Sequence, residues 1–225
     1  MEQPAWVEFF FDPICPWAYQ TSLWMRDVRD RTDLDVRWRF FSLEEINRVE
    51  GKKHPWERPW SYGWSLMRVG ALLRREEPAL LDRWYAATGE ALFEQGEPVF
   101  LQEGAERVAA EAGLPADVVA RALADETTHD DVRSDHDHVV STYAGYGVPT
   151  LVFPTGQAIF GPVVVPAPRG DDALALWDVV RGWLQFPHLY EMRTPKRRAD
   201  HEHIAAAFEP YLRARKWQTI QNPVE

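Results

Sequence analysis

The chain has 225 residues, with 25 lysines and arginines against 35 aspartates and glutamates, so its formal net charge at pH 7 is −10. Such an acidic balance repels phosphate backbones and anionic lipids, which argues against binding of nucleic acid or of a membrane surface as the main activity. Hydrophobic residues make up 45% of the chain and charged residues 27%, a composition that predicts a folded globular protein and excludes a disordered chain or a coiled-coil rod.

Cysteine usage and hydropathy narrow the class of protein further. Cys15 is the only cysteine, so no internal disulfide can form and any redox chemistry needs a second molecule. The first residues, MEQPAWVEFFFD, lack the basic region and apolar run of a secretory signal. No apolar run approaches the roughly 18 residues that span a bilayer. We therefore expect a cytoplasmic protein with no membrane partner.

The chain begins with a predicted strand, helix and strand. Residues 6–11 are aromatic and β-branched and end at an Asp-Pro pair, as a buried strand would. Over residues 16–30, apolar side chains recur at spacings of three and four, which predicts an amphipathic helix with proline in its first turn. Residues 35–41 alternate between apolar and charged before becoming fully apolar, which predicts a second strand.

A long helical region follows. We expect helices at residues 56–75, 78–94, 104–112, 115–124 and 127–144, the last of which ends at Gly145. Glycine suits the end of a helix because it adopts the left-handed conformation without steric cost.

The last part of the chain returns to strands. Residues 147–153 and 157–161 are β-rich runs around a three-residue turn, which predicts a hairpin. Further helices are expected at residues 171–184 and 199–216. The element order predicts an α/β protein. We expect residues 1–42 and 146–225 to form one domain, with residues 43–145 as an inserted helical subdomain.

Cys15 lies at the junction of the first strand and the first helix. A lone cysteine is most often a small buried hydrophobe. At a helix N-terminus, however, unpaired backbone N–H groups and the helix dipole stabilise the thiolate over the thiol. This position therefore predicts a partly exposed, nucleophilic cysteine with a pKa below that of a free thiol.

Two segments carry a resemblance to a known family. Phe11-Asp12-Pro13-Ile14-Cys15-Pro16-Trp17-Ala18 resembles the active-site segment of the DsbA-like branch of the thioredoxin superfamily, and Gly147-Val148-Pro149-Thr150 is similar to the cis-proline loop of that superfamily. Within the branch, the nearest resemblance is to mycothiol-dependent nitroreductase-like proteins. It implies a thioredoxin-like fold, built as βαβ, helical insertion, β-hairpin and helix.

The resemblance also implies roles for individual residues. Cys15 would be the attacking thiolate, Pro149 a cis-proline, and Val148 the residue whose backbone binds a disulfide substrate. Pro16, Trp17 and Thr150 would complete the substrate-binding loops. The other prolines are expected to be trans, because only about 5 to 6% of such bonds are cis.

Ala18 departs from the dithiol members of the family, which carry a second cysteine at this place. Alanine cannot resolve a mixed disulfide. The implied chemistry is therefore monothiol, with a small thiol such as mycothiol or glutathione as co-substrate and no tightly bound cofactor. A cysteine replaced by alanine to trap such an adduct would give the same sequence.

Trp56, Trp60 and Trp64 recur every four residues and would form one aromatic face on a helix, with Met67 three residues further on. This face either forms the wall of a pocket above Cys15 that receives flat substrates or the sugar part of a thiol, or it is a core stripe that docks the insertion onto the sheet. The spacing favours neither interpretation.

Histidines and aspartates gather at residues 129–138, which raises the question of a metal site. His129 and His136 share a helix face whereas His138 does not, and no cysteine completes a tetrahedral set. We interpret the cluster as a solvated acidic face at the start of a helix and expect no metal.

Three functions remain open. The leading one is a cytosolic thiol-disulfide oxidoreductase or nitroreductase-like enzyme, in which Cys15 attacks a mixed disulfide or an electrophile and a small thiol releases the product. The second is an enzyme like the kappa-type glutathione transferases and chromene-carboxylate isomerases, in which Cys15 orients a bound thiol without reacting. The third is a non-catalytic binding module whose aromatic face captures an apolar partner.

Overall fold

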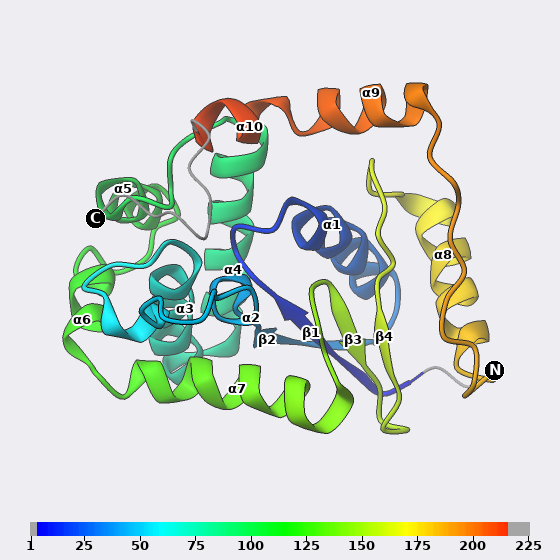
Figure 1. The fold of residues 1–225 in the computed structure, drawn as a ribbon, viewed down its shortest axis with the longest axis horizontal. Helices are drawn as coiled ribbons and strands as arrows, with labels where there is room; N and C mark the ends of the chain where they lie inside the picture. The colour runs from blue at the N-terminus through cyan, green and yellow to red at the C-terminus, as the bar shows by residue number, and fades with distance from the viewer. Residues whose placement is uncertain (1–3, 216–225) are drawn as a thin grey trace.

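The computed structural model describes residues 4–215, and its first elements are the expected strand, helix and strand (Figure 1). Strand β1 is Trp6–Phe11, helix α1 is Pro16–Arg31 and strand β2 is Asp35–Phe40. β2 lies parallel to β1 along its whole length, from Trp6 opposite Asp35 to Phe11 opposite Phe40. The predicted βαβ unit is therefore confirmed.

The hairpin completes the sheet. Strand β3, Thr150–Val152, is antiparallel to β1, and strand β4, Ala158–Phe160, is antiparallel to β3. The resulting strand order is β2-β1-β3-β4. This four-stranded sheet with helices confirms the predicted α/β class.

The two faces of the sheet carry different side chains. Phe11 stacks on Tyr85 of the insertion at 3.8 Å between ring centroids, and the Arg26 guanidinium of α1 lies 4.5 Å over the Trp38 ring. On the opposite face Glu8 pairs with Arg39, which also contacts Asp135 of the insertion. A charged bridge thus ties the insertion to the edge strand β2.

Residues between β2 and β3 form the helical insertion. Its elements are α2 (Leu43–Ile46), the short helix η1 (Pro55–Glu57), α3 (Tyr62–Glu76), α4 (Pro78–Gly89), the π-helical turn η2 (Glu90–Glu94), α5 (Gln102–Glu111), α6 (Val118–Ala124) and α7 (Thr128–Tyr143). The predicted helix 56–75 is divided, because Pro59 disfavours helical geometry at Arg58, which is extended with φ −111° and ψ 144°.

The end of α7 differs from the expectation at one residue. Ala144, and not Gly145, adopts the left-handed conformation, with φ 54°. Glycine serves a different purpose here: the Gly145 N–H donates to the Val139 carbonyl at 3.0 Å, and a Cβ on Gly145 would lie 2.9 Å from the Val139 side chain. Close approach of the backbone therefore requires the glycine.

Three helices end the described chain. Helix α8 is Gly170–Trp183, α9 is Arg198–Ala207 and α10 is Glu209–Arg215. The predicted helix 199–216 is divided at Phe208, since Pro210 has no N–H to bond the carbonyl four residues earlier. Residue 216, its expected end, lies outside the described residues. Figure 1 shows α9 and α10 running across one end of the molecule, over α1.

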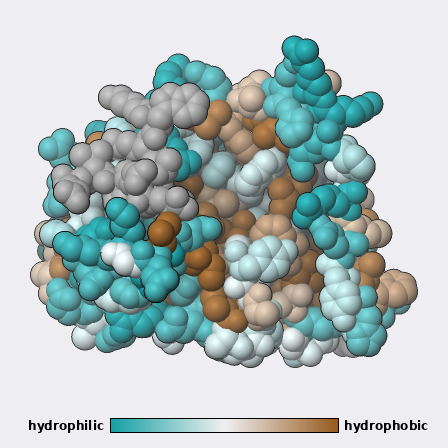
Figure 2. Space-filling model, viewed as in Figure 1, coloured by the Kyte–Doolittle hydropathy of each residue, from teal (hydrophilic) through white to brown (hydrophobic). Residues whose placement is uncertain are grey.

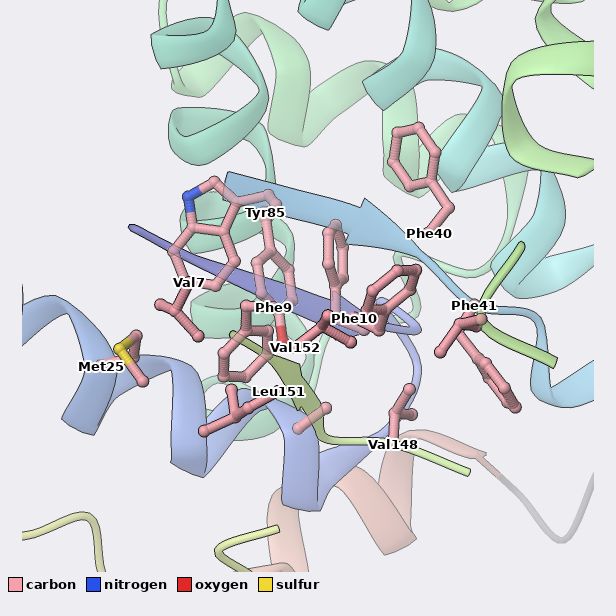
Figure 3. Packing of buried hydrophobic residues seen from close by; sticks show 14 of the residues in the cluster. Val7, Phe9, Phe10, Met25, Phe40, Phe41, Tyr85, Val148, Leu151 and Val152 are labelled. Carbon is pink, nitrogen blue, oxygen red and sulfur yellow. The ribbon is translucent and has the colours of Figure 1, made fainter. Parts of the chain in front are cut away.

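Two hydrophobic clusters stabilise this arrangement. The first surrounds the sheet on both faces: in Figure 3, Phe9 and Leu151 lie toward α1 and its Met25, whereas Phe10 belongs to the opposite face. The second lies within the insertion and among its neighbours. In the view of Figure 2, apolar side chains gather in a central hollow between the insertion and the hairpin. None of the described helices is long and apolar enough to cross a bilayer.

A glycine on α3 tests the contact between the insertion and the end of β1. A Cβ on Gly63 would lie 2.4 Å from Asp12 Oδ1, and the Asp12 carboxylate is held by two backbone N–H groups. Gly63→Ala should lower the free energy of unfolding by about 2 to 3 kcal/mol through overpacking, measured by urea denaturation. Gly182→Ala on α8 is the matched control, since its Cβ meets nothing within 4 Å and should raise stability by up to about 1 kcal/mol. Equal effects of the two changes would contradict the predicted clash.

Candidate active site

The Cys15 sulfur sits at the start of α1. Cys15 is the residue that caps the helix, with extended backbone at φ −92° and ψ 112°, and Pro16 is the first helical residue. The Ala18 N–H donates a hydrogen bond to Sγ at 3.4 Å. The predicted position of the sulfur at a helix N-terminus is confirmed.

The cis-proline loop lies beside this sulfur. The Val148–Pro149 peptide bond is cis, as predicted, and the Cys15 thiol donates to the Val148 carbonyl at 3.7 Å. Thr150 begins β3 and its hydroxyl donates to the Gly147 carbonyl at 2.7 Å, which closes the loop on itself. The fold therefore brings together residues that lie 133 positions apart.

Two further prolines contradict the expectation that all others are trans. The Gly161–Pro162 and Val165–Pro166 bonds are also cis. Both lie after β4, in a segment where the Pro162 carbonyl accepts a hydrogen bond from Thr21 of α1 at 2.7 Å. This contact between distant segments was not visible in the local sequence.

The predicted exposure and acidity of Cys15 are wrong. The residue is only 5% exposed, and burial raises its pKa to about 12. The backbone N–H groups of Ala18 and Trp17 do lower the pKa, as expected for a helix start, but the loss of solvation outweighs them. In this structure the group is therefore a neutral thiol at pH 7.

A buried carboxylate lies at the start of the thiol loop, which is formed by residues 12–15. Asp12 is 0% exposed, and its two oxygens accept the N–H groups of Ile14 at 3.1 Å and Leu43 at 2.8 Å. Burial raises its pKa to about 6. The ionised carboxylate in turn raises the Cys15 pKa. In the sequence, Asp12 ends the first strand and belongs to the segment that resembles a DsbA-like active site, but nothing there indicated its burial.

Glu44 is a second buried carboxylate beside Asp12. Burial, followed by the charge of Asp12, raises the Glu44 pKa to about 7. Glu44 accepts the Trp64 N–H at 3.2 Å and contacts the Arg58 guanidinium at 3.4 Å. Nothing in the spacing of the sequence indicated this pair.

The C-terminal helices cover the site. Phe208 packs edge-on against Trp17, with ring centroids 4.8 Å apart, and Tyr211 packs on Phe93 at 5.2 Å. Burial raises the pKa of Tyr211, and Cys15 acts on it in the same direction, so α10 lies within electrostatic reach of the sulfur. Periodicity predicted a helix here but gave no sign of what it covers.

Two of the three tryptophans pack together, since the Trp56 and Trp64 ring centroids lie 5.2 Å apart, whereas Trp60 packs against the other hydrophobic cluster. Trp64 is 1% exposed in the core around the sheet and donates from Nε1 to His129 at 2.7 Å, whereas Trp60 donates to the Phe100 carbonyl at 2.7 Å. Trp56 lies in η1 and lines a surface pocket. The extended residues Arg58 and Ser61 between η1 and α3 break the helical spacing, which turns Trp60 away from the other two.

The histidines and aspartates of α7 are not simply a solvated face. His129, Asp135 and His136 are buried, and each accepts hydrogen bonds from a neighbouring element. Asp135, for example, accepts the Phe40 N–H at 3.1 Å. These three buried side chains therefore hold α7 against the neighbouring elements through hydrogen bonds. No group of three or more potential metal ligands lies together within residues 4–215.

Comparison with known proteins decides the family. A model of the Rv2466c-like family, described as mycothiol-dependent nitroreductase Rv2466c, matches residues 14–194. The chain belongs to the Rv2466c-like family. The match includes the Cys15 loop and the cis-proline loop, and it ends before α9 and α10.

Relatives of this Rv2466c-like protein agree with the family. The chain is 56% identical over 214 residues to Rv2286c of Mycobacterium tuberculosis, described as an uncharacterized protein, which covers 95% of this chain and 92% of the relative. The probable DsbA oxidoreductase SCO1869 of Streptomyces coelicolor has a similar structure, with TM-score 0.52, 19% identity, and coverage of 85% of this chain and 92% of that one.

A second similar structure is the cytosolic disulfide reductase DsbM of Pseudomonas aeruginosa, solved with GSH. Its TM-score is 0.54 at 17% identity, and the match covers 79% of this chain and 99% of that one. The DsbA-like thioredoxin fold expected from the sequence is thus confirmed. The family confirms the enzyme class, a thiol-dependent oxidoreductase of the thiol-disulfide or nitroreductase-like kind.

The charge of Asp12 should slow the reaction of Cys15 with iodoacetamide. Asp12→Asn removes a negative charge that raises the thiol pKa, so the alkylation rate at pH 8 should rise about tenfold, as one pKa unit would produce. The two rates should converge below pH 6, where Asp12 itself is protonated. Asp33→Asn, an exposed carboxylate, is the control. A rate that does not change at pH 8 would contradict the electrostatic contribution of Asp12.

The contact between Phe208 and Trp17 should limit access to Cys15. Phe208→Ala removes the ring that holds α10 on the thiol loop, and the alkylation rate should rise at least about tenfold, which corresponds to about 1.4 kcal/mol less closing free energy. Leu212→Ala on α10 is the control, because the Leu212 side chain is 46% exposed. If both variants react at the rate of the unmodified protein, α10 does not gate the thiol.

Proposed function

We propose that the protein is a cytoplasmic monothiol oxidoreductase that exchanges disulfides through Cys15 with mycothiol as its small thiol. One observation carries this proposal: a single sulfur caps α1 and faces the cis-proline loop, while a buried alanine occupies the place of a resolving thiol. Cys15 supplies the only thiol of the chain, so the second thiol must come from another molecule.

The exchange balances in two steps. The Cys15 thiolate attacks the mycothiol sulfur of a mixed disulfide between a substrate and mycothiol. A new bond forms between Cys15 and mycothiol, and the substrate leaves as a thiolate that takes a proton. A second mycothiol thiolate then attacks the bound mycothiol sulfur. Cys15 is released, and the oxidised product is mycothiol disulfide.

The thiol becomes active when the C-terminal helices α9 and α10, which cover the site, move away from it. In the closed form, burial makes the largest contribution to the raised Cys15 pKa, and the N–H groups of Ala18 and Trp17 act against it. When α10 moves away from Trp17, solvent reaches the sulfur and the helix donors remain in place. The thiolate then forms where the disulfide binds.

Further observations support mycothiol as the thiol and the cytoplasm as the location of the protein. The family description names mycothiol. The fold also binds small thiols elsewhere, since DsbM was solved with GSH and is described as cytosolic. A chain with one cysteine has no internal disulfide for an oxidising compartment to maintain.

A second function fits one observation. A neutral thiol with a pKa near 12 is a hydrogen-bond donor and a poor nucleophile, which suits an enzyme that orients a bound thiol, as in the transferase-like alternative. In that case Cys15 would never become covalently modified. A non-catalytic binding module would show neither an adduct nor turnover.

Intact mass after incubation with mycothiol disulfide separates these functions. The unmodified protein should hold a stable adduct on Cys15. In Ala18→Cys, a second thiol one helical turn from the first should release mycothiol and form an internal disulfide. Cys15→Ala, which should form no adduct, is the control. If the unmodified protein forms no adduct with any small-thiol disulfide, the monothiol mechanism is wrong and the transferase-like function takes its place.

A further inference from the structure

A surface pocket lies between α2, η1 and α7, outside the contacts already described for the sulfur. Its volume is about 530 Å³, within the range of small-molecule sites. Two carboxylates, Glu45 and Asp137, line it together with Arg133, His136 and the ring of Trp56, and aliphatic side chains of α2 and α7 complete the lining. Charged, polar and aromatic groups thus converge on one hollow.

The pocket and the thiol loop share a piece of backbone. The Leu43 N–H at the start of α2 donates to Asp12, and the preceding N–H, of Ser42, donates to His136 Nδ1 at 3.1 Å. Trp56 also packs against the hydrophobic cluster that contains Cys15 and Val148. A molecule in the pocket therefore lies next to the segment that supports the sulfur.

The pocket is lined by two residues with N–H donors, His136 and Arg133, and one of these donors, Arg133 Nε, is buried without an acceptor among the described residues. Burial lowers the pKa of His136, so its ring is neutral at pH 7, and because Nδ1 accepts from Ser42 the proton lies on Nε2. Arg133 Nε is buried and has no hydrogen-bond partner within residues 4–215, although the guanidinium lies 4.5 Å over the Trp56 ring. Unpaired buried donors of this kind indicate a bound acceptor.

The same pocket offers acceptors. His54 contacts the Glu45 carboxylate at 2.9 Å, which fixes its position, and the charges of Asp137 and Glu45 both act on His136. Hydroxyl groups both donate and accept, so they fit carboxylates and N–H donors side by side. A tripeptide thiol such as glutathione would instead bring its own carboxylates against Glu45 and Asp137, in a chain of net charge −10.

We infer that this pocket binds the uncharged, hydroxyl-rich part of a sugar-bearing thiol such as mycothiol, and so selects that class over peptide thiols. The inference rests on the proposed function for the reaction at Cys15 but adds a recognition site that the reaction does not require. Asp137 and Arg133 are the specificity residues that it assigns.

Binding without chemistry is the first test. The probe is N-acetylglucosaminyl-inositol, which keeps the uncharged sugar part of mycothiol and carries acetyl in place of its sulfur-bearing acyl group, titrated by calorimetry into the full chain and into Cys15→Ala. Saturable binding is expected in both. Asp137→Ala and Arg133→Ala should each weaken it about tenfold, the effect of one charged hydrogen bond. Glu103→Ala removes one negative charge, as Asp137→Ala does, but from an exposed position of α5, and it should not alter binding of the probe. Absence of binding to the unmodified protein would overturn the inference.

Reaction rates separate this inference from the proposed function. The adduct on Cys15 is followed by intact mass with mycothiol disulfide and with diacetylcystine, which has the same reacting group and no sugar. Asp137→Ala should react about tenfold more slowly with the first and at the unmodified rate with the second. If neither disulfide reacts while N-acetylglucosaminyl-inositol still binds, the monothiol mechanism fails and the pocket stands. If adducts form but Asp137→Ala slows neither, the pocket assignment is wrong.

Discussion

The Asp12 carboxylate has no exposed surface, and yet three parts of the chain meet at it. It accepts N–H groups from the thiol loop and from the start of α2, and it lies against the backbone of α3 at Gly63. Each contact has a consequence: the loop that carries Cys15 is held in shape, the insertion is fixed to the end of β1, and the sulfur gains a negative neighbour. Burial of one ionisable group therefore links the fold to the acidity of the site.

Opposing effects set the state of the thiol. Helix α1 directs backbone donors at the sulfur, and these favour the thiolate. Burial of the sulfur favours the thiol, and in this structure it prevails. Close to this sulfur, Phe208 packs on Trp17 and Tyr211 packs on Phe93, so a few aromatic contacts hold the C-terminal helices over this part of the molecule.

The site lies at the seam between the sheet and the insertion. The thiol loop comes from the first strand, the cis-proline loop from the end of the insertion, and the cover from the last helices. The pocket of Trp56 and Asp137 lies on the insertion side of the same seam. The groups to which the proposals above assign reaction and recognition thus come from different parts of the chain, and Ala18 is not among the residues that line the pocket. Function on this fold depends on the site and not on the architecture alone.

Local sequence determined the order and type of most elements. The βαβ unit, the hairpin, the helix N-terminus at Cys15 and the loop of Pro149 were all predictable, because hydrophobic period, proline position and turn residues act over a few residues. The breaks at Arg58 and Phe208 also have local causes, since Pro59 and Pro210 each disturb the helical pattern.

Tertiary structure alone decided what those elements bury. The 5% exposure of Cys15, the separation of Trp60 from Trp56 and Trp64, and the docking of His136 on Ser42 depend on residues many positions away. Solvation of a thiol or a histidine is a property of everything packed around it, and periodicity reports only which face of an element is apolar. For this reason the sequence located the sulfur correctly, whereas its pKa was decided by burial and by the charge of Asp12, acting against the N–H groups of Ala18 and Trp17.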